Sequence, residues 1–172
     1  MDAPAQARPY AALMDWLKQN GIDHEIHEHA AAFTAASTAR ADGVTARTFA
    51  KVVGVIADDD RKALIVLDAP DHVDLGKVTK VMDAKEVRLM TELELAAMAP
   101  GCEPGATPAV GSLFGSPMFA DHAVREDPEI SFNAGTHRHA VRVDRVAWEQ
   151  ATGVQYGDLA VFEERLPAWA LS

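Results

Sequence analysis

The chain has 172 residues, of which 48% are hydrophobic, and this length fits one domain that buries about two thirds of the surface of its unfolded chain. Its 16 basic and 26 acidic residues give a formal net charge of −10 at pH 7. This charge argues against the broad phosphate-binding face of a DNA-binding protein, because such a face depends on clustered lysine and arginine. Any contact with a nucleic acid should therefore be small or confined to one end of it.

The ends and the single cysteine indicate the compartment. Residues 1–9 form a short Ala/Pro/Gln-rich tail, which we expect to be flexible and which lacks the apolar segment of a signal peptide. No later run approaches the length of a membrane span. Cys102 is the only cysteine, which excludes an internal disulfide and a multi-cysteine zinc site. These features predict a cytoplasmic protein without a membrane contact.

The first half of the chain predicts two helices and three strands. Residues 10–19 repeat apolar side chains at helical spacing until Asn20 and Gly21 end the helix, and residues 22–29 alternate as a strand. Thr34 stands where an N-cap would begin a short Ala-rich helix ending near Gly43. Residues 49–56 and 63–67 are rich in β-branched residues and flank a polar turn at 58–61. We expect them to form an antiparallel hairpin at the centre of a sheet.

The second half adds the remaining elements around a long loop. A helix is predicted from Asp74 to about Met82, a short strand at 87–90, and a helix at 91–98 that opens with Thr-Glu-Leu-Glu. Residues 100–117 hold four glycines and four prolines and should be irregular. Strands at 117–120, 129–133 and 138–143 precede a helix at 144–150. The predicted fold is an α/β (α+β) domain with a mixed, mainly antiparallel central sheet surrounded by helices.

Lys51 is the first candidate for a functional residue. It is the one charged side chain in a strand, residues 49–56, that is apolar on both faces and so should be buried. Burying an unpaired ammonium is costly. Lys51 therefore either extends out from the end of the strand or lies in a cleft where a partner or an anionic ligand meets it.

Two loops are the next candidates. In Glu103-Pro-Gly-Ala-Thr-Pro108, closely spaced glycine and proline fix the backbone and can expose N–H groups to a carbonyl or an oxyanion. In the segment 132–137, glycine closes a turn and should place Thr136 and His137 at an accessible tip. An ordinary surface turn and a plain hairpin turn, respectively, are the alternative interpretations.

Histidine pairs and Cys102 offer two other chemistries. The pairs His27-x-His29 and His137-x-His139 each place two imidazoles on one strand face, and they would form a zinc site only if both pairs converged. Cys102 has no recognisable base nearby in sequence, so we interpret it as a passive loop thiol. We predict no metal and no other cofactor.

The order of these segments resembles the YbaK/ProX-type family, free-standing relatives of the editing domain inserted in bacterial prolyl-tRNA synthetases. The resemblance covers residues 22–159, the expected core. It rests on the following segments: His29 with Thr34, 49–54, 73–77, 85–89, 102–108 and 132–137.

The resemblance implies hydrolysis of the ester that joins a mischarged amino acid, a small one such as Ala or Cys, to the acceptor end of a tRNA of the proline type. It places the catalytic lysine at Lys51. It places the substrate-binding residues at these positions: His29, Thr34, Gly105, Ala106, Thr107, Pro108, Gly135, Thr136 and His137. The chain departs from the family after Pro108, where family loops often carry a second proline or a phenylalanine. Whether a synthetase is a further partner is left open.

Two other functions remain open at this point. The same pocket could belong to a binding module that holds an aminoacylated end or a small ligand without turnover, with Lys51 as an anchor only. The paired histidines could instead belong to a small metal hydrolase, which would bind stoichiometric zinc.

Overall fold

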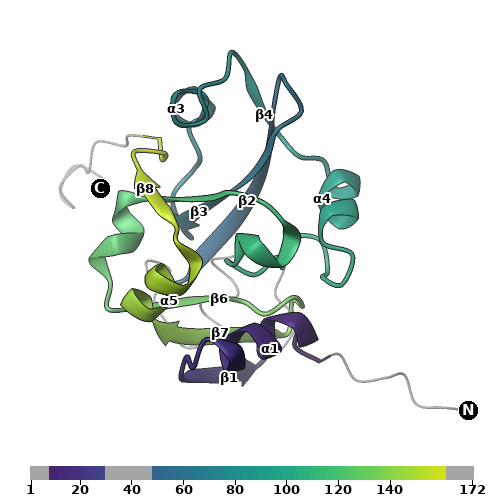
Figure 1. Cartoon of the computed structure of the whole chain (residues 1–172), viewed down its shortest axis with the longest axis vertical. Helices are drawn as coiled ribbons and strands as arrows, with labels where there is room; N and C mark the ends of the chain where they lie inside the picture. Colours follow the sequence, from purple (N-terminus) through teal and green to yellow (C-terminus); the bar gives the residue numbers. More distant parts are fainter. Residues whose placement is uncertain (1–7, 30–47, 162–172) are drawn as a thin grey trace, which may run out of the picture.

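The computed structural model describes residues 8–29 and 48–161 (Figure 1). The expected tail up to residue 7 and Thr34 with the helix predicted after it lie outside the described residues. Within the described ranges, no helix is both long and apolar enough to cross a membrane.

The predicted helices and strands are present in the described ranges, with ends that differ from the expected ones by at most two residues. The helices are α1 (Ala11–Gln19), α3 (Leu75–Val81), α4 (Glu92–Met98) and α5 (Arg145–Thr152). The strands are β1 (His24–Glu28), β2 (Ala50–Ala57), β3 (Lys62–Asp68), β4 (Val87–Leu89), β5 (Met118–Asp121), β6 (Glu129–Asn133), β7 (His139–Asp144) and β8 (Gln155–Gly157). The sequence did not predict β8 or the two 3-10 helices η1 (Gly111–Phe114) and η2 (His122–Glu126).

Side-chain caps explain where three helices begin. Asp74 accepts a hydrogen bond from the Lys77 N–H, and Asp144 accepts one from the Ala147 N–H. Thr91 and Glu94 form a reciprocal capping box. Each cap satisfies a backbone donor that the first turn of a helix leaves without a partner.

The mixed, mainly antiparallel α/β fold class is confirmed, and the strands divide into two sheets. One is antiparallel with the order β1-β7-β6, and the other has the order β4-β2-β3-β5-β8. The predicted hairpin pairs β2 with β3 near the middle of the second sheet, and β5 and β8 extend that sheet by parallel pairing. Parallel neighbours require long crossovers, which here contain the helices α3, α4 and α5.

The two sheets meet at an isolated parallel bridge between Phe49 and Ser131. Alternate residues of β2 pack into two different hydrophobic clusters. Ala50 belongs to the cluster that contains α1 and α5, whereas Val55 belongs to the cluster beneath α3. β2 therefore runs between two cores and carries Lys51 close to the junction of the sheets.

Candidate functional site

The loop predicted to bind substrate begins with a tight turn over Glu103 to Ala106. The Ala106 N–H donates to the Glu103 carbonyl at 3.0 Å, and Gly105 has φ +84°. Proline followed by glycine at positive φ is the sequence preference of a type II turn. Gly105 is exposed, but residues 106–110 are buried. The loop is thus a surface turn only as far as Gly105, after which the chain enters the core.

The second predicted loop, residues 134–137, is joined to this turn by backbone hydrogen bonds. The Gly135 N–H donates to the Ala106 carbonyl at 3.0 Å, and the Glu103 N–H donates to the Gly135 carbonyl at 2.8 Å. The His137 N–H also donates to Glu103 Oε2 at 3.0 Å. The structure therefore brings together two of the three predicted parts of the site.

The expectation that Thr136 and His137 lie at an accessible tip is wrong. They are 8% and 7% exposed, because their loop lies beneath the 103–106 turn instead of projecting from a hairpin. Thr136 Oγ1 lies 2.7 Å from His139 Nδ1, and His137 Nε2 lies 2.8 Å from the Pro104 carbonyl oxygen. The His137 side chain fastens the second loop to the 103–106 turn, whereas the Thr136 side chain holds the second loop to the start of β7.

His29 lies next to the second loop. Its N–H donates to the Arg138 carbonyl at 2.8 Å, one residue beyond the end of β1. Pairing of β1 with β7 thus carries His29 to the edge of the candidate site.

Lys51 is half-buried on β2, opposite Leu67 of β3. Among the described residues, its ammonium makes no hydrogen bond and no ion pair. Burial lowers the pKa of the Lys51 amine, and the negative charge of Asp71 partly opposes this effect. The position combines the two expected alternatives, because the side chain reaches solvent in part yet is substantially desolvated.

Several polar groups of the 105–107 segment are unsatisfied. Within residues 8–29 and 48–161, the N–H groups of Gly105 and Thr107 have no acceptor. Thr107 is 3% exposed and its Oγ1 is buried without a hydrogen-bond partner in the same ranges. Buried polar groups in native proteins are normally paired. The buried groups of Thr107 are therefore suited to a ligand, and the N–H of Gly105, which is exposed, is accessible to the same ligand.

The histidine pairs do not converge in the strand register. His27 lies opposite Ala140, whereas His139 lies opposite Glu28, so the two imidazoles leave the sheet on opposite faces. In the part of the chain that the structure describes, no group of three or more His, Cys, Asp or Glu could hold a metal ion.

Cys102 has the properties of a passive thiol. It is buried, and burial raises the pKa of its thiol to about 11. Because the thiolate is the nucleophilic form, this thiol is poorly suited to covalent catalysis near neutral pH.

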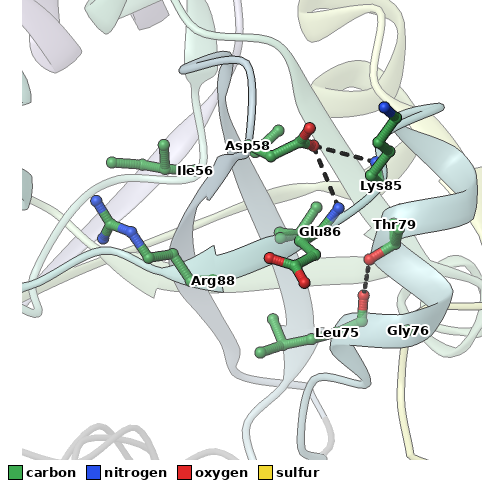
Figure 2. Close-up of a pocket in the computed structure, with 10 residues that line it drawn as sticks. Ile56, Asp58, Leu75, Gly76, Thr79, Lys85, Glu86 and Arg88 are labelled. Atoms are coloured by element: carbon green, nitrogen blue, oxygen red, sulfur yellow. Dashed lines mark hydrogen bonds between the residues drawn. The ribbon is translucent and has the colours of Figure 1, made fainter.

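A cavity that the sequence did not predict lies at the other end of β2, between α3 and β4 (Figure 2). It has a volume of about 460 Å³, with Ile56 and Leu75 among its apolar lining. Asp58 accepts hydrogen bonds from the Lys85 and Glu86 N–H groups at 3.1 and 3.2 Å and so fixes the wall. Lys51 lies five residues before Ile56 on β2, roughly 16 Å along the strand, so this cavity is distinct from the candidate site.

Comparisons with known proteins show the family and the fold. The family described as an aminoacyl-tRNA editing domain matches residues 29–162. A crystal structure of a candidate trans-editing enzyme for prolyl-tRNA synthetase is 24% identical and has a TM-score of 0.80, with 91% of this chain and 100% of the other covered.

Two further solved structures share the fold. A scaffold protein from computational grafting of linear epitopes is 23% identical, with a TM-score of 0.79 and coverage of 89% and 97%. The hypothetical protein APE2540 is 16% identical, with a TM-score of 0.79 and coverage of 87% and 99%. The comparison with curated proteins gave no match.

Proposed function

Because the chain belongs to the aminoacyl-tRNA editing domain family, we propose that it hydrolyses the ester of a mischarged aminoacyl-tRNA, acting in trans to the synthetase. The proposed substrate is a tRNA of the proline type that carries a small amino acid such as Ala or Cys. The observation that carries the proposal is the hydrogen-bonded pairing of the Gly105 turn with the Gly135 loop, which holds the unsatisfied donors of the 105–107 segment in place.

In the proposed reaction, a water oxygen attacks the ester carbonyl carbon. The bond from that carbon to the ribose oxygen breaks, the ribose oxygen takes a proton, and the products are the free amino acid and the uncharged tRNA. The N–H groups of Gly105 and Thr107 would donate to the carbonyl oxygen as it becomes negatively charged, and fixed donors of this kind lower the barrier. No covalent nucleophile is needed.

Lys51 is the proposed catalytic residue. Its ammonium makes no hydrogen bond and no close ion pair with the described residues and interacts only with the charge of Asp71, so it is available to polarise the ester or to pair with a phosphate of the terminal nucleotide. A half-desolvated cation interacts with an anionic group more strongly than one in bulk water does. Its effect should be felt both in substrate binding and in the stabilisation of the developing oxyanion.

The remaining predicted residues divide into two groups. Ala106, Pro108 and Gly135 shape the backbone around the donors, and His29 lies at the edge of the site. Thr136 and His137 are both buried, so we assign His137 to positioning the 103–106 turn and Thr136 to shaping the second loop. Thr34 keeps its predicted role in substrate binding as part of the proposal.

The acidic charge fits a contact that is limited to the acceptor end. With a net charge of −10, the protein cannot neutralise many tRNA phosphates. Affinity for tRNA alone should be modest and should fall with salt, and a partner synthetase could supply the rest of the tRNA contact.

The test is a deacylation screen with tRNA of the proline type charged with Ala, Cys or Pro. We expect release of Ala or Cys at a rate far above the uncatalysed rate, with Pro retained. A pure binding module would shift the tRNA in a filter-binding assay while leaving every ester intact. That result would replace the hydrolase with a binding function.

A further inference from the structure

Asn133, the last residue of β6, carries a buried polar atom that the fold does not use. The residue is 7% exposed, and within the described ranges its Oδ1 has no hydrogen-bond partner. A buried acceptor that is left unpaired costs free energy, which a ligand donor would recover.

The strand register places Asn133 on the same face as Lys51. Phe49 and Ser131 form a parallel bridge, so their side chains point to the same side. Lys51 lies two residues after Phe49, and Asn133 lies two residues after Ser131. Residues two apart in a strand point to the same face, so Lys51 and Asn133 share the face of the bridge pair. The intervening Ala50 and Phe132 belong to the core cluster on the opposite side.

Asn133 also lies next to the Gly105 loop. Two residues after Asn133, the Gly135 N–H donates to the Ala106 carbonyl, and Thr107 follows directly. The unpaired oxygens of Asn133 and Thr107 thus lie on two segments that are hydrogen-bonded to each other, beside the strand that carries Lys51.

We propose that Asn133 Oδ1 binds the free ribose hydroxyl next to the ester on the terminal adenosine of the substrate. This inference rests on the proposed function and adds a substrate-binding residue to the same site. An aminoacyl-adenosine end offers two donors near the ester, the ribose hydroxyl and the α-ammonium. The hydroxyl fits better, because the ammonium of Lys51 on the same face repels a second cation.

The experiment is a double-mutant cycle between the protein and its substrate. Wild-type protein and Asn133→Leu are compared on alanyl-tRNA of the proline type that ends in either adenosine or 2′-deoxyadenosine, with single-turnover rates and substrate Kd as readouts. The lower intrinsic reactivity of the deoxy ester affects both proteins equally and cancels. Removing the ribose hydroxyl should lower the single-turnover rate of the wild type by a factor roughly tenfold larger than the factor for Asn133→Leu. A tenfold difference corresponds to the loss of one hydrogen bond. Asn133→Asp, which keeps an acceptor oxygen, should retain much of the wild-type discrimination.

Stability provides the second readout. Because Oδ1 is unpaired in the fold, Asn133→Leu should melt at the wild-type temperature or above it. If removing the ribose hydroxyl slows both proteins by the same factor, the inference is wrong, although the proposed hydrolase function is unaffected. If Asn133→Leu instead changes the rate effect of N-acetylating the alanyl group, Asn133 binds the α-ammonium and the assignment to the ribose hydroxyl is wrong. Failure of wild-type protein to release any amino acid would overturn the proposed function itself.

Discussion

His137 Nε2 lies 2.8 Å from the carbonyl oxygen of Pro104, although 33 residues separate the two in the chain. The imidazole is buried, and its Cε1 lies 3.4 Å from the point where a Cβ on Gly105 would stand. This contact fixes the turn that presents the proposed oxyanion donors.

Replacing His137 with Ala should lower the free energy of unfolding by about 1–3 kcal/mol, because it leaves the Pro104 carbonyl without this partner and opens a cavity. Urea denaturation measures the change. His122→Ala is the matched control, since His122 is exposed on η2 and should change stability by less than about 0.5 kcal/mol. Equal effects of the two substitutions would contradict the positioning role.

Gly105→Ala should reduce both stability and deacylation. Gly105 has φ +84°, so a side chain there costs about 1 kcal/mol and would meet the His137 ring at 3.4 Å. Gly153→Ala is a close control, because Gly153 has φ +64° and open space around it, at the end of α5. Both variants should lose similar stability, but only Gly105→Ala should lower the deacylation rate per folded molecule. A similar loss of activity in both would mean that strain alone accounts for it.

Lys51→Ala should reduce deacylation by on the order of a hundredfold or more while leaving the melting temperature close to wild type. The half-buried ammonium makes no ion pair in the described residues, and the attraction to Asp71 that its removal loses is smaller than the cost of burying the charge. Lys62→Ala is the matched control on the same hairpin, because Lys62 is exposed at the start of β3, opposite Ile56, and lies away from the candidate site. A structural lysine would show the reverse pattern, with altered melting and unchanged activity per folded molecule.

Cys102 should react slowly with iodoacetamide in the folded protein. Burial raises the pKa of its thiol from 9.0 to about 11, which lowers the thiolate fraction at pH 8 about a hundredfold. The folded protein binds this proton more tightly than the unfolded chain, so the associated stability is present below pH 9 and is lost as the pH rises toward 11. Alkylation in urea, where the shift disappears, is the control. Fast alkylation of the folded protein would show that the thiol is activated.

The sequence by itself determined the elements and much of their order. The 58–61 turn, the Thr91 capping box and the Pro104-Gly105 turn depend on residues within a few positions of each other. Local backbone preferences and alternating hydrophobicity are encoded over such short spans. The family resemblance also came from sequence, since the order of short motifs is a linear property.

Tertiary structure alone decided which of these segments meet. The pairing of Ala106 with Gly135, the burial of Thr136 and His137, and the shared face of Lys51 and Asn133 all join residues far apart in the chain. Apolar periodicity shows that a segment has a buried face but not which segment covers it. The free energy of closing such long loops is recovered only when the two sheets pack together, so these contacts are properties of the folded chain.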